Sequence, residues 1–246
     1  MASSSVTTAD RDLFIGTAGW SIPKLNADRF PSAGSHLERY ATVFSTAEIN
    51  TSFYRPHRRS TYERWAAAVP EAFRFAVKAP KSVSHSDWSD MDGNLRAFFA
   101  EIDGLGQKLG AVLLQLPPKR HFDPIEADRF LRDVRSRSDV DMALEPRHPS
   151  WFTGPADTLL QVHRIARVAA DPPPAPGADR PGGYPSVTYM RLHGSPTIYR
   201  SPYGTERLTH LARDLRTSTS RTWCVFDNTA SYAATGDALA LQALMD

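Results

Sequence analysis

The segments AVLLQLPP (residues 111–118) and DMALEPRHP (residues 141–149) decide the fold class. Each is a short run of apolar and β-forming residues that ends in polar or turn-forming residues. Six more runs share this form, at residues 13–20, 43–50, 73–80, 165–171, 187–194 and 222–229. Apolar residues at helical spacing follow most of them, as at Leu95, Phe98 and Ile102. Strands that alternate with helices along 246 residues predict one α/β domain, a (β/α)8 TIM-like barrel.

Two segments bear on this interpretation. An open, doubly wound sheet is the alternative architecture, and it often carries a glycine-rich dinucleotide loop. IGTAG (residues 15–19) has neither the GxGxxG spacing nor a following helix, which favours a closed barrel. Residues 172–185 (PPPAPGADRPGGYP) exclude a regular helix in the sixth crossover, because proline lacks the N–H that a helix needs. We expect an irregular loop beside the barrel mouth, acting either as a lid or as a plain surface connection.

The composition is that of an ordinary globular protein, with 41% hydrophobic residues and a formal net charge of +2. No apolar run approaches the roughly 20 residues that span a bilayer, so no membrane interaction is expected. Residues 1–12 lack the basic start and apolar stretch of a signal peptide. We expect them to form a flexible tail before a single domain at residues 13–246, and we expect a cytoplasmic location. Cys224 is the only cysteine and is expected to be a core residue.

The densest group of reactive side chains is LEPRHPSW (residues 144–151). Alternate residues of a strand share a face, so Glu145 and Arg147 are both expected to point into the mouth. A glutamate there suits a general base, and an arginine suits a bidentate clamp for a carboxylate or phosphate. A buried Glu145–Arg147 pair without a catalytic role is the alternative.

The segment MRLHG (residues 190–194) repeats this arrangement on the seventh expected strand. Arg191 and His193 are two residues apart and therefore share a face. Arg191 offers a second anion contact, and His193 titrates near neutrality and can carry a proton. Gly194 allows a ligand or another stretch of backbone to approach closely.

Polar and aromatic side chains also stand at the ends of the remaining runs. The catalytic candidates are Glu145, Glu48, His193 and Asp227, and the ligand-binding candidates are Lys78, Gln115, Arg147, His148, Trp151, Arg191, Asn228, Asn50, Tyr54 and Trp20. Acids and cations around one cavity suit a polar, anionic ligand. For the aromatic rings, sealing of the barrel rim is an equally good interpretation. The sequence has neither the HExxH nor the CxxC spacing of common metal sites, so we assign no metal ligands. No cofactor is evident. The minority alternative is a divalent metal held by the acidic candidates and His193.

Seven motifs along the chain resemble those of the YecE-like family, domain of unknown function 72. They are IGTAGW (15–20), EINTSFYRP (48–56), FRFAVKAPKSVSH (73–85), LGAVLLQLPP (109–118), LEPRHPSW (144–151), MRLHG (190–194) and VFDNT (225–229). The resemblance implies a TIM-barrel-like fold, and it implies no particular activity because the family has none established. Two stretches differ from the family pattern: SIPKL (21–25) is less aromatic, and Asp227-Asn228 stands in place of an asparagine pair. Both lie at the expected mouth, where a change alters which ligand fits.

Three functions are compatible with these residues. The leading hypothesis is an enzyme or binder for a small anionic ligand, for example a phosphorylated or sugar-like one, with Glu145 or Glu48 as acid/base and Lys78, Arg147 and Arg191 as anion clamps. The second is a metal-dependent nucleic-acid phosphodiesterase, suggested by the basic run RPHRR (residues 55–59). The third is a non-catalytic metabolite-binding or scaffold protein, which needs the same polar cavity. The oligomeric state is not indicated.

Overall fold

The chain forms one mixed α/β domain around a ten-stranded sheet. The structure, a computed structural model, describes residues 12–246, so the expected tail lies outside the described residues except for Asp12. The strands are β1 (Leu13–Ala18), β2 (Thr46–Ile49), β3 (Arg74–Lys78), β4 (Leu109–Gln115), β5 (Asp141–Glu145), β6 (Ala166–Arg167), β7 (Ala169–Asp171), β8 (Gly182–Gly183), β9 (Val187–Leu192) and β10 (Arg221–Phe226). Their order in the sheet is β7-β9-β10-β1-β2-β3-β4-β5-β6-β8.

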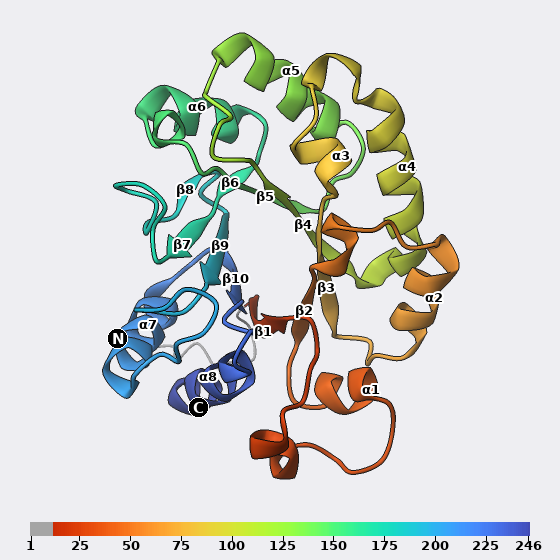
Figure 1. The fold of residues 1–246 in the computed structure, drawn as a ribbon, viewed down its shortest axis with the longest axis vertical. Coiled ribbons are helices and arrows are strands. Elements are labelled where there is room, and N and C mark those ends of the chain that lie inside the picture. The colour runs from red at the N-terminus through yellow and green to blue at the C-terminus, as the bar shows by residue number, and fades with distance from the viewer. Residues whose placement is uncertain (1–11) are drawn as a thin grey trace, which may run out of the picture.

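The sheet is barrel-like and nearly closed (Figure 1). Every pairing is parallel except that of β8, which runs antiparallel to β6. β6 pairs with β5, while β7 pairs with β9 near the other end of the sheet. Only Val168 separates β6 from β7 in the chain, and its N–H donates to the carbonyl of Leu144 on β5. One stretch of backbone therefore joins the two ends of the sheet.

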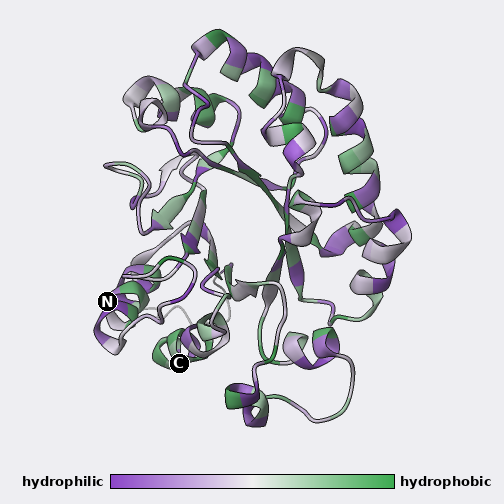
Figure 2. Ribbon diagram, in the orientation of Figure 1, coloured by the Kyte–Doolittle hydropathy of each residue, from purple (hydrophilic) through white to green (hydrophobic). Residues whose placement is uncertain are grey.

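Helices cover the outside of this ring of strands (Figure 1). They are α1 (His36–Ala41), α2 (Arg59–Ala67), α3 (Lys81–Ser84), α4 (Asp92–Ile102), α5 (Pro124–Arg135), α6 (Gly154–Val162), α7 (Thr205–Thr217) and α8 (Ala233–Met245). Figure 2 shows hydrophobic and hydrophilic residues alternating along these helices. The expected stripe on α4 is confirmed, since Leu95, Phe98 and Ile102 are buried.

Helix α5 shows how the local sequence defines an element. Asp123 caps its start, because its carboxylate accepts from the backbone N–H groups of Ile125 and Glu126, both at 2.9 Å. Pro124 occupies the first turn, where a missing N–H costs nothing. Phe130 and Val134 then face the core.

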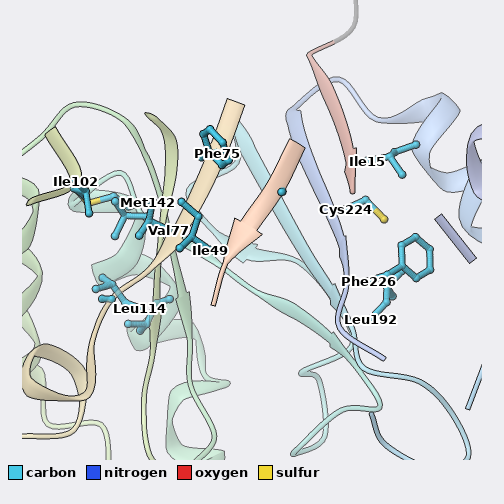
Figure 3. Packing of buried hydrophobic residues seen from close by; sticks show 14 of the residues in the cluster. Ile15, Ile49, Phe75, Val77, Ile102, Leu114, Met142, Leu192, Cys224 and Phe226 are labelled. Carbon is cyan, nitrogen blue, oxygen red and sulfur yellow. The ribbon is translucent and has the colours of Figure 1, made fainter. Parts of the chain in front are cut away.

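The hydrophobic residues form two layers. The outer layer lies between strands and helices and includes Ile49, Phe75, Val77 and Leu114 (Figure 3). The inner layer fills the barrel with Ala76, Ala111, Leu113, Ala143, Ala166, Val168, Ala170, Val187, Tyr189, Trp223 and Val225. Small alanines from β3 to β7 thus pack with the large rings of β9 and β10, which keeps the interior filled.

This inner layer positions the polar residues at the carboxyl ends of the strands. Strand side chains alternate between faces, so a residue two positions beyond an inward-facing one also faces inward. The pairs are Ala76 and Lys78, Leu113 and Gln115, Ala143 and Glu145, Tyr189 and Arg191, and Val225 and Asp227. The polar group therefore lies directly on top of the packed interior.

Residues 172–185 form the irregular connection expected from their prolines, with β8 as its only regular element. The guanidinium of Arg167 holds this loop by donating to the carbonyls of Gly177 at 3.2 Å and Arg180 at 3.3 Å. Arg167 also pairs with Asp157 on α6 at 2.8 Å. These bonds attach the loop to the side of the barrel.

Two further expectations concern the burial of Cys224 and the absence of a membrane-spanning helix. Cys224 is buried in the outer core layer, and burial raises the pKa of its thiol to about 12. Among residues 12–246, no helix combines the length and apolar character that crossing a bilayer requires.

Candidate functional site

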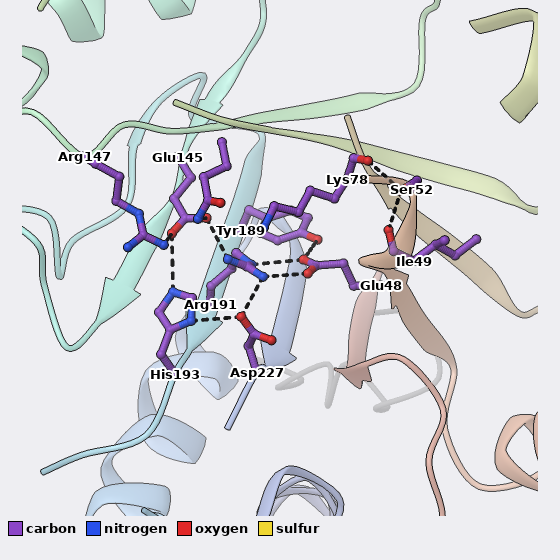
Figure 4. Close-up of polar contacts among 11 residues, drawn as sticks. Glu48, Ile49, Ser52, Lys78, Glu145, Arg147, Tyr189, Arg191, His193 and Asp227 are labelled. Atoms are coloured by element: carbon purple, nitrogen blue, oxygen red, sulfur yellow. Dashed lines mark hydrogen bonds and ion pairs between the residues drawn. The ribbon is translucent and has the colours of Figure 1, made fainter. Parts of the chain in front are cut away.

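Arg191, on the inward face of β9, is the centre of a buried group of charged side chains (Figure 4). Its guanidinium donates to both carboxylate oxygens of Glu48, at 2.7 and 3.1 Å. It also donates to Glu145 at 2.8 Å and to Asp227 at 2.9 Å. Burial lowers the pKa of Arg191, but the three carboxylates outweigh burial and raise it well above its ordinary value. The hydrogen bonds of Arg191 therefore go to the protein's own carboxylates.

His193 lies one residue beyond β9, between two of these carboxylates. Its Nδ1 is 3.1 Å from Asp227 Oδ2, and its Nε2 is 3.3 Å from Glu145 Oε1. Only the protonated imidazolium donates from both nitrogens at once. Burial opposes protonation, yet the bonds to Asp227 and Glu145 raise the pKa of His193 above its ordinary value. The geometry therefore favours a charged His193.

Glu145, the last residue of β5, is bonded from several sides. Besides Arg191 and His193, it accepts from Gln115 at 3.1 Å and from Arg147 at 2.6 Å. Burial raises the pKa of Glu145, but Arg191 and the other partners outweigh burial and hold it well below its usual range. Glu145 is thus ionised and fully engaged in the resting protein.

Arg147 is the cation of this group that faces outward. Its side chain is 19% exposed, compared with 0% for Arg191. One terminal nitrogen binds Glu145, whereas its Nε has no hydrogen-bond partner among residues 12–246. Arg147 therefore has a partly exposed side chain and a buried Nε–H that is unpaired among these residues.

Lys78, the last residue of β3, is buried with 5% of its surface exposed. Its side chain points from the strand toward Arg191 (Figure 4), and its Nζ lies 4.1 Å from the centre of the Phe53 ring. Within residues 12–246, no carboxylate lies within 4.0 Å of this amine. Burial and the charge of Arg191 lower the pKa of Lys78, and they outweigh the three acids Glu48, Glu145 and Asp227, which raise it. The resulting pKa is about 8.

Two residues of the site escaped the sequence interpretation. Tyr189 donates its hydroxyl to Glu48 at 2.9 Å, and the Phe53 ring lies 4.1 Å from the Nζ of Lys78. Tyr189 is two residues before Arg191, so the same alternation that selected Arg191 and His193 already placed it on their face. Phe53 reaches Lys78 from the short 3₁₀ helix Thr51–Phe53, a contact that strand periodicity does not reveal.

Trp20 and Asn50 lie to one side of the charged group, in a pocket of about 420 Å³. Thr51, His57 and Trp65 also line this pocket. The Oδ1 of Asn50 is buried without a hydrogen-bond partner among residues 12–246. The structure therefore places these two candidates beside the charged group rather than within it.

Three other candidates lie apart from the charged group. Trp151 is completely buried in the outer core layer, where its indole donates to the carbonyl of Arg120. Tyr54 is 74% exposed. His148 packs against His121 and bonds Ser150. The expectation that these side chains converge with the others is not met, because the turns after β2 and β5 carry them outward.

Asn228 and Gly194 both contact Ser201, in the loop that follows β9. Asn228 donates to the carbonyl of Ser201 at 2.9 Å and to Asp237 at 2.6 Å. Gly194 adopts a φ of +92°, and a Cβ there would lie 2.5 Å from the same Ser201 carbonyl. Close approach at Gly194 is therefore made by backbone, one of the two alternatives that the sequence left open.

The arrangement of acids bears on metal binding. Within residues 12–246, no three His, Cys, Asp or Glu side chains are grouped so as to hold a metal ion. The carboxylates of Glu48, Glu145 and Asp227 instead converge on one guanidinium. A positive charge thus already occupies the position between the acids.

The family described as protein of unknown function DUF72 matches residues 14–246. The chain belongs to the DUF72 family.

Two curated relatives carry the name UPF0759. YecE of Escherichia coli K12 is 30% identical over 142 residues, which cover 57% of this chain and 50% of YecE. YunF of Bacillus subtilis 168 is 30% identical over 152 residues, which cover 58% of this chain and 53% of YunF. These matches thus span about half the length of the two relatives.

Solved DUF72 structures share the fold. A DUF72 protein of Thermotoga maritima MSB8 has a TM-score of 0.76 at 25% identity, with 95% of this chain and 98% of that chain covered. A DUF72 protein of Enterococcus faecalis V583 has a TM-score of 0.79 at 20% identity, with 95% of each chain covered. The family is of unknown function, so its site has to be interpreted from its own chemistry.

Proposed function

We propose that this DUF72 protein is an enzyme that acts on a small anionic substrate at the carboxyl ends of its strands. The charge balance of the buried group carries this proposal. Three carboxylates, Glu48, Glu145 and Asp227, face four cationic side chains when His193 is protonated, namely Lys78, Arg147, Arg191 and His193. One positive charge is left over in a site of low exposure, where an anion is favoured.

Arg147 and Lys78 are the side chains that suit contact with this anion. Arg147 has an unpaired Nε–H and a partly exposed side chain, and Lys78 has no carboxylate within 4.0 Å among the residues described. Arg191, by contrast, is the framework that holds the three acids together. A substrate carboxylate or phosphate between Arg147 and Lys78 would complete the pairing of charges.

His193 suits the role of proton carrier better than Glu145 does. Glu145 is held ionised by Arg191, Arg147 and Gln115, so it offers no proton in the resting state. His193 carries a proton on each nitrogen, and its pKa is raised from a value near neutrality. After His193 gives that proton to a substrate, the carboxylates of Asp227 and Glu145 would favour its reprotonation by solvent or by product, because they stabilise the imidazolium.

We also propose that β6 and β7 are the two halves of one strand. With that strand counted once and the short β8 set aside, the sheet has the eight parallel strands of a (β/α)8 barrel. The carboxyl-end location of the charged group is the location of active sites in that fold, which supports the proposal by analogy only.

A thermal-shift titration tests the binding step. Orthophosphate, pyruvate and glyceraldehyde 3-phosphate are added to the wild type, to Arg147→Ala and to Arg132→Ala, a control on the surface of α5 that is paired with Asp128. We expect at least one anion to raise the melting temperature of the wild type and of the control, and Arg147→Ala to lose most of that shift. Stabilisation by none of the anions, or equal stabilisation of Arg147→Ala, would contradict the proposal. An anion that binds but is never converted under assay would identify a non-catalytic binder instead.

A further inference from the structure

Lys78 is buried beside the charged group although it forms no ion pair with any of the three carboxylates. A lysine that serves only to balance buried charge is expected to pair with a carboxylate, because an unpaired buried ammonium loses its hydration without return. Three carboxylates are present in the same group, yet all three bind Arg191. Lys78 instead lies over the face of Phe53. Its amine is therefore left available on the inward side of the barrel.

The surroundings of Lys78 hold this amine in place. The hydroxyl of Ser52 donates to the backbone carbonyl of Lys78 at 2.7 Å and to that of Ile49 at 2.9 Å, which joins the ends of β2 and β3. The Phe53 ring then covers one side of the Nζ atom. A reactive group gains from such fixed positioning, since less freedom is lost when a substrate arrives.

We propose that Lys78 is a nucleophile that forms a Schiff base with an anionic aldehyde or ketone. This inference rests on the proposed function, because it takes the anionic group of the substrate to be held by Arg147. The ammonium form of Lys78 attracts the anion, and the neutral form, which arises when the amine loses its proton, is the one that reacts. It adds a carbonyl carbon as the reacting atom.

The bond changes balance without an added co-reactant. The neutral Nζ of Lys78 attacks the carbonyl carbon, and the carbonyl oxygen takes a proton from the His193 imidazolium. The nitrogen of the resulting carbinolamine releases a proton, which returns to His193. The hydroxyl group then takes this proton from His193 and leaves as water, and a protonated imine and a neutral His193 remain. This imine withdraws electrons from the neighbouring carbon, so bonds at that carbon are the ones such an enzyme would break.

The electrostatics near Lys78 permit the neutral amine. The charged groups around it are Arg191 on β9, which disfavours the ammonium form, and Glu48 on β2, Glu145 on β5 and Asp227 after β10, which favour it. Burial adds to the effect of Arg191, and the pKa of Lys78 is about 8. At pH 7 roughly a tenth of such amines are neutral, compared with less than a thousandth for an ordinary lysine.

Trapping with sodium cyanoborohydride tests the proposal, because this reagent reduces an imine to a stable amine. The wild type is incubated with pyruvate, with dihydroxyacetone phosphate, and with neutral acetone, and then analysed by intact mass and peptide mapping. We expect one adduct, on Lys78, with at least one of the two anionic carbonyl compounds and at least tenfold less with acetone. The two anionic probes distinguish a carboxylate substrate from a phosphorylated one. Trapping is expected to increase as the pH rises through about 8.

Two variants and a control make the outcome decisive. Lys78→Arg keeps the charge but cannot form an imine, and Lys78→Met covers the case in which the arginine does not fit the site. Lys81→Arg is the control, because Lys81 is exposed, only three residues away, and also lies over an aromatic ring. The adduct should disappear in both Lys78 variants and persist in Lys81→Arg.

The failures of the two proposals look different. If pyruvate or dihydroxyacetone phosphate stabilises the wild type but leaves no adduct on Lys78, the Schiff base is excluded and the anion site stands. If an adduct is spread over surface lysines and survives in Lys78→Met, the Schiff base is likewise excluded. If neither compound reacts, the Schiff base is excluded, and the anion site is excluded as well if orthophosphate and glyceraldehyde 3-phosphate also fail to stabilise the wild type.

Discussion

Arg191 and Arg147 belong to one network but have different physical roles. Arg191 is fully enclosed and compensates three buried carboxylates, whereas Arg147 is partly exposed and bonds one. Removing one partner from a buried ion pair leaves the other charge uncompensated in a poorly solvated place. At the scale of single residues, arginine therefore stabilises the folded protein at position 191, whereas at position 147 it can also bind a ligand.

Arg191→Ala should lower the free energy of unfolding by about 3–5 kcal/mol. Arg147→Ala should lower it by only about 1 kcal/mol, because Glu145 keeps its bonds to Arg191 and Gln115. Urea denaturation followed by circular dichroism measures both values. Equal losses for the two variants would show that Arg191 is not the centre of the network.

Asp227→Asn should lower the pKa of His193. The variant replaces one of the two carboxylates that raise this pKa by a neutral amide. Because folding raises the pKa of His193, its contribution to stability is complete below its ordinary value of about 6.5 and is lost as the pH rises through the folded value. Histidine proton shifts followed against pH by NMR measure the change, with Asp214→Asn on α7 as the control. An unchanged titration in Asp227→Asn would refute the assigned contact.

Lys78→Met should stabilise the protein at neutral pH. Folding lowers the pKa of Lys78 from 10.5 to about 8, so the folded state disfavours the ammonium form by roughly 3 kcal/mol. Between pH 8 and 10.5 the unfolded wild type binds more protons than the folded wild type, and wild-type stability should therefore rise toward that of the variant. Denaturation midpoints measured across this range test the sign. A variant less stable than the wild type at pH 7 would contradict it.

At the scale of elements, strand periodicity explains what the sequence could predict about the site. Glu48, Lys78, Gln115, Glu145, Arg191 and Asp227 all stand at strand ends on the inward face, and each was selected from its place in an apolar run. The contacts among them could not be predicted, because Glu48 and Arg191 are 143 residues apart and meet only across the barrel. Trp151 and Tyr54 were misplaced because they follow turns, where alternation no longer determines direction.

In the connection at residues 172–185, the two carbonyls of Gly177 and Arg180 are bonded by one side chain, Arg167 on β6. Arg167→Ala removes the donors to Gly177 and Arg180 and also removes the ion pair of Asp157, which keeps only its bond from the Gly183 N–H. We expect faster amide hydrogen exchange in residues 172–185 of this variant, measured by mass spectrometry, with little change in β3 and β4. Arg180→Ala is the control, because its exposed side chain makes none of these bonds and its carbonyl remains. Exchange that is as slow as in the wild type would show that the loop is held by other contacts.

At the scale of the whole molecule, the two ends of the barrel differ in chemistry. The carboxyl ends of the strands carry the network around Arg191, and the opposite end carries a pocket of about 500 Å³ that is lined by two arginines, Arg74 and Arg221, and three aspartates, Asp12, Asp139 and Asp141. Arg221 is already bonded to Asp12 and Asp141 there. The alternation of strands and helices in one α/β domain was predictable from the sequence, whereas the three short strands β6, β7 and β8 in the sixth unit were not, because β6 and β7 pair with two different neighbours.

A crystal structure of the protein soaked with orthophosphate is the measurement that tests the central claim most directly. The account predicts a phosphate at the carboxyl ends of the strands, within hydrogen-bonding distance of the Arg147 guanidinium and the Lys78 amine. Phosphate bound only at the opposite end, beside Arg74 and Arg221, would contradict the account.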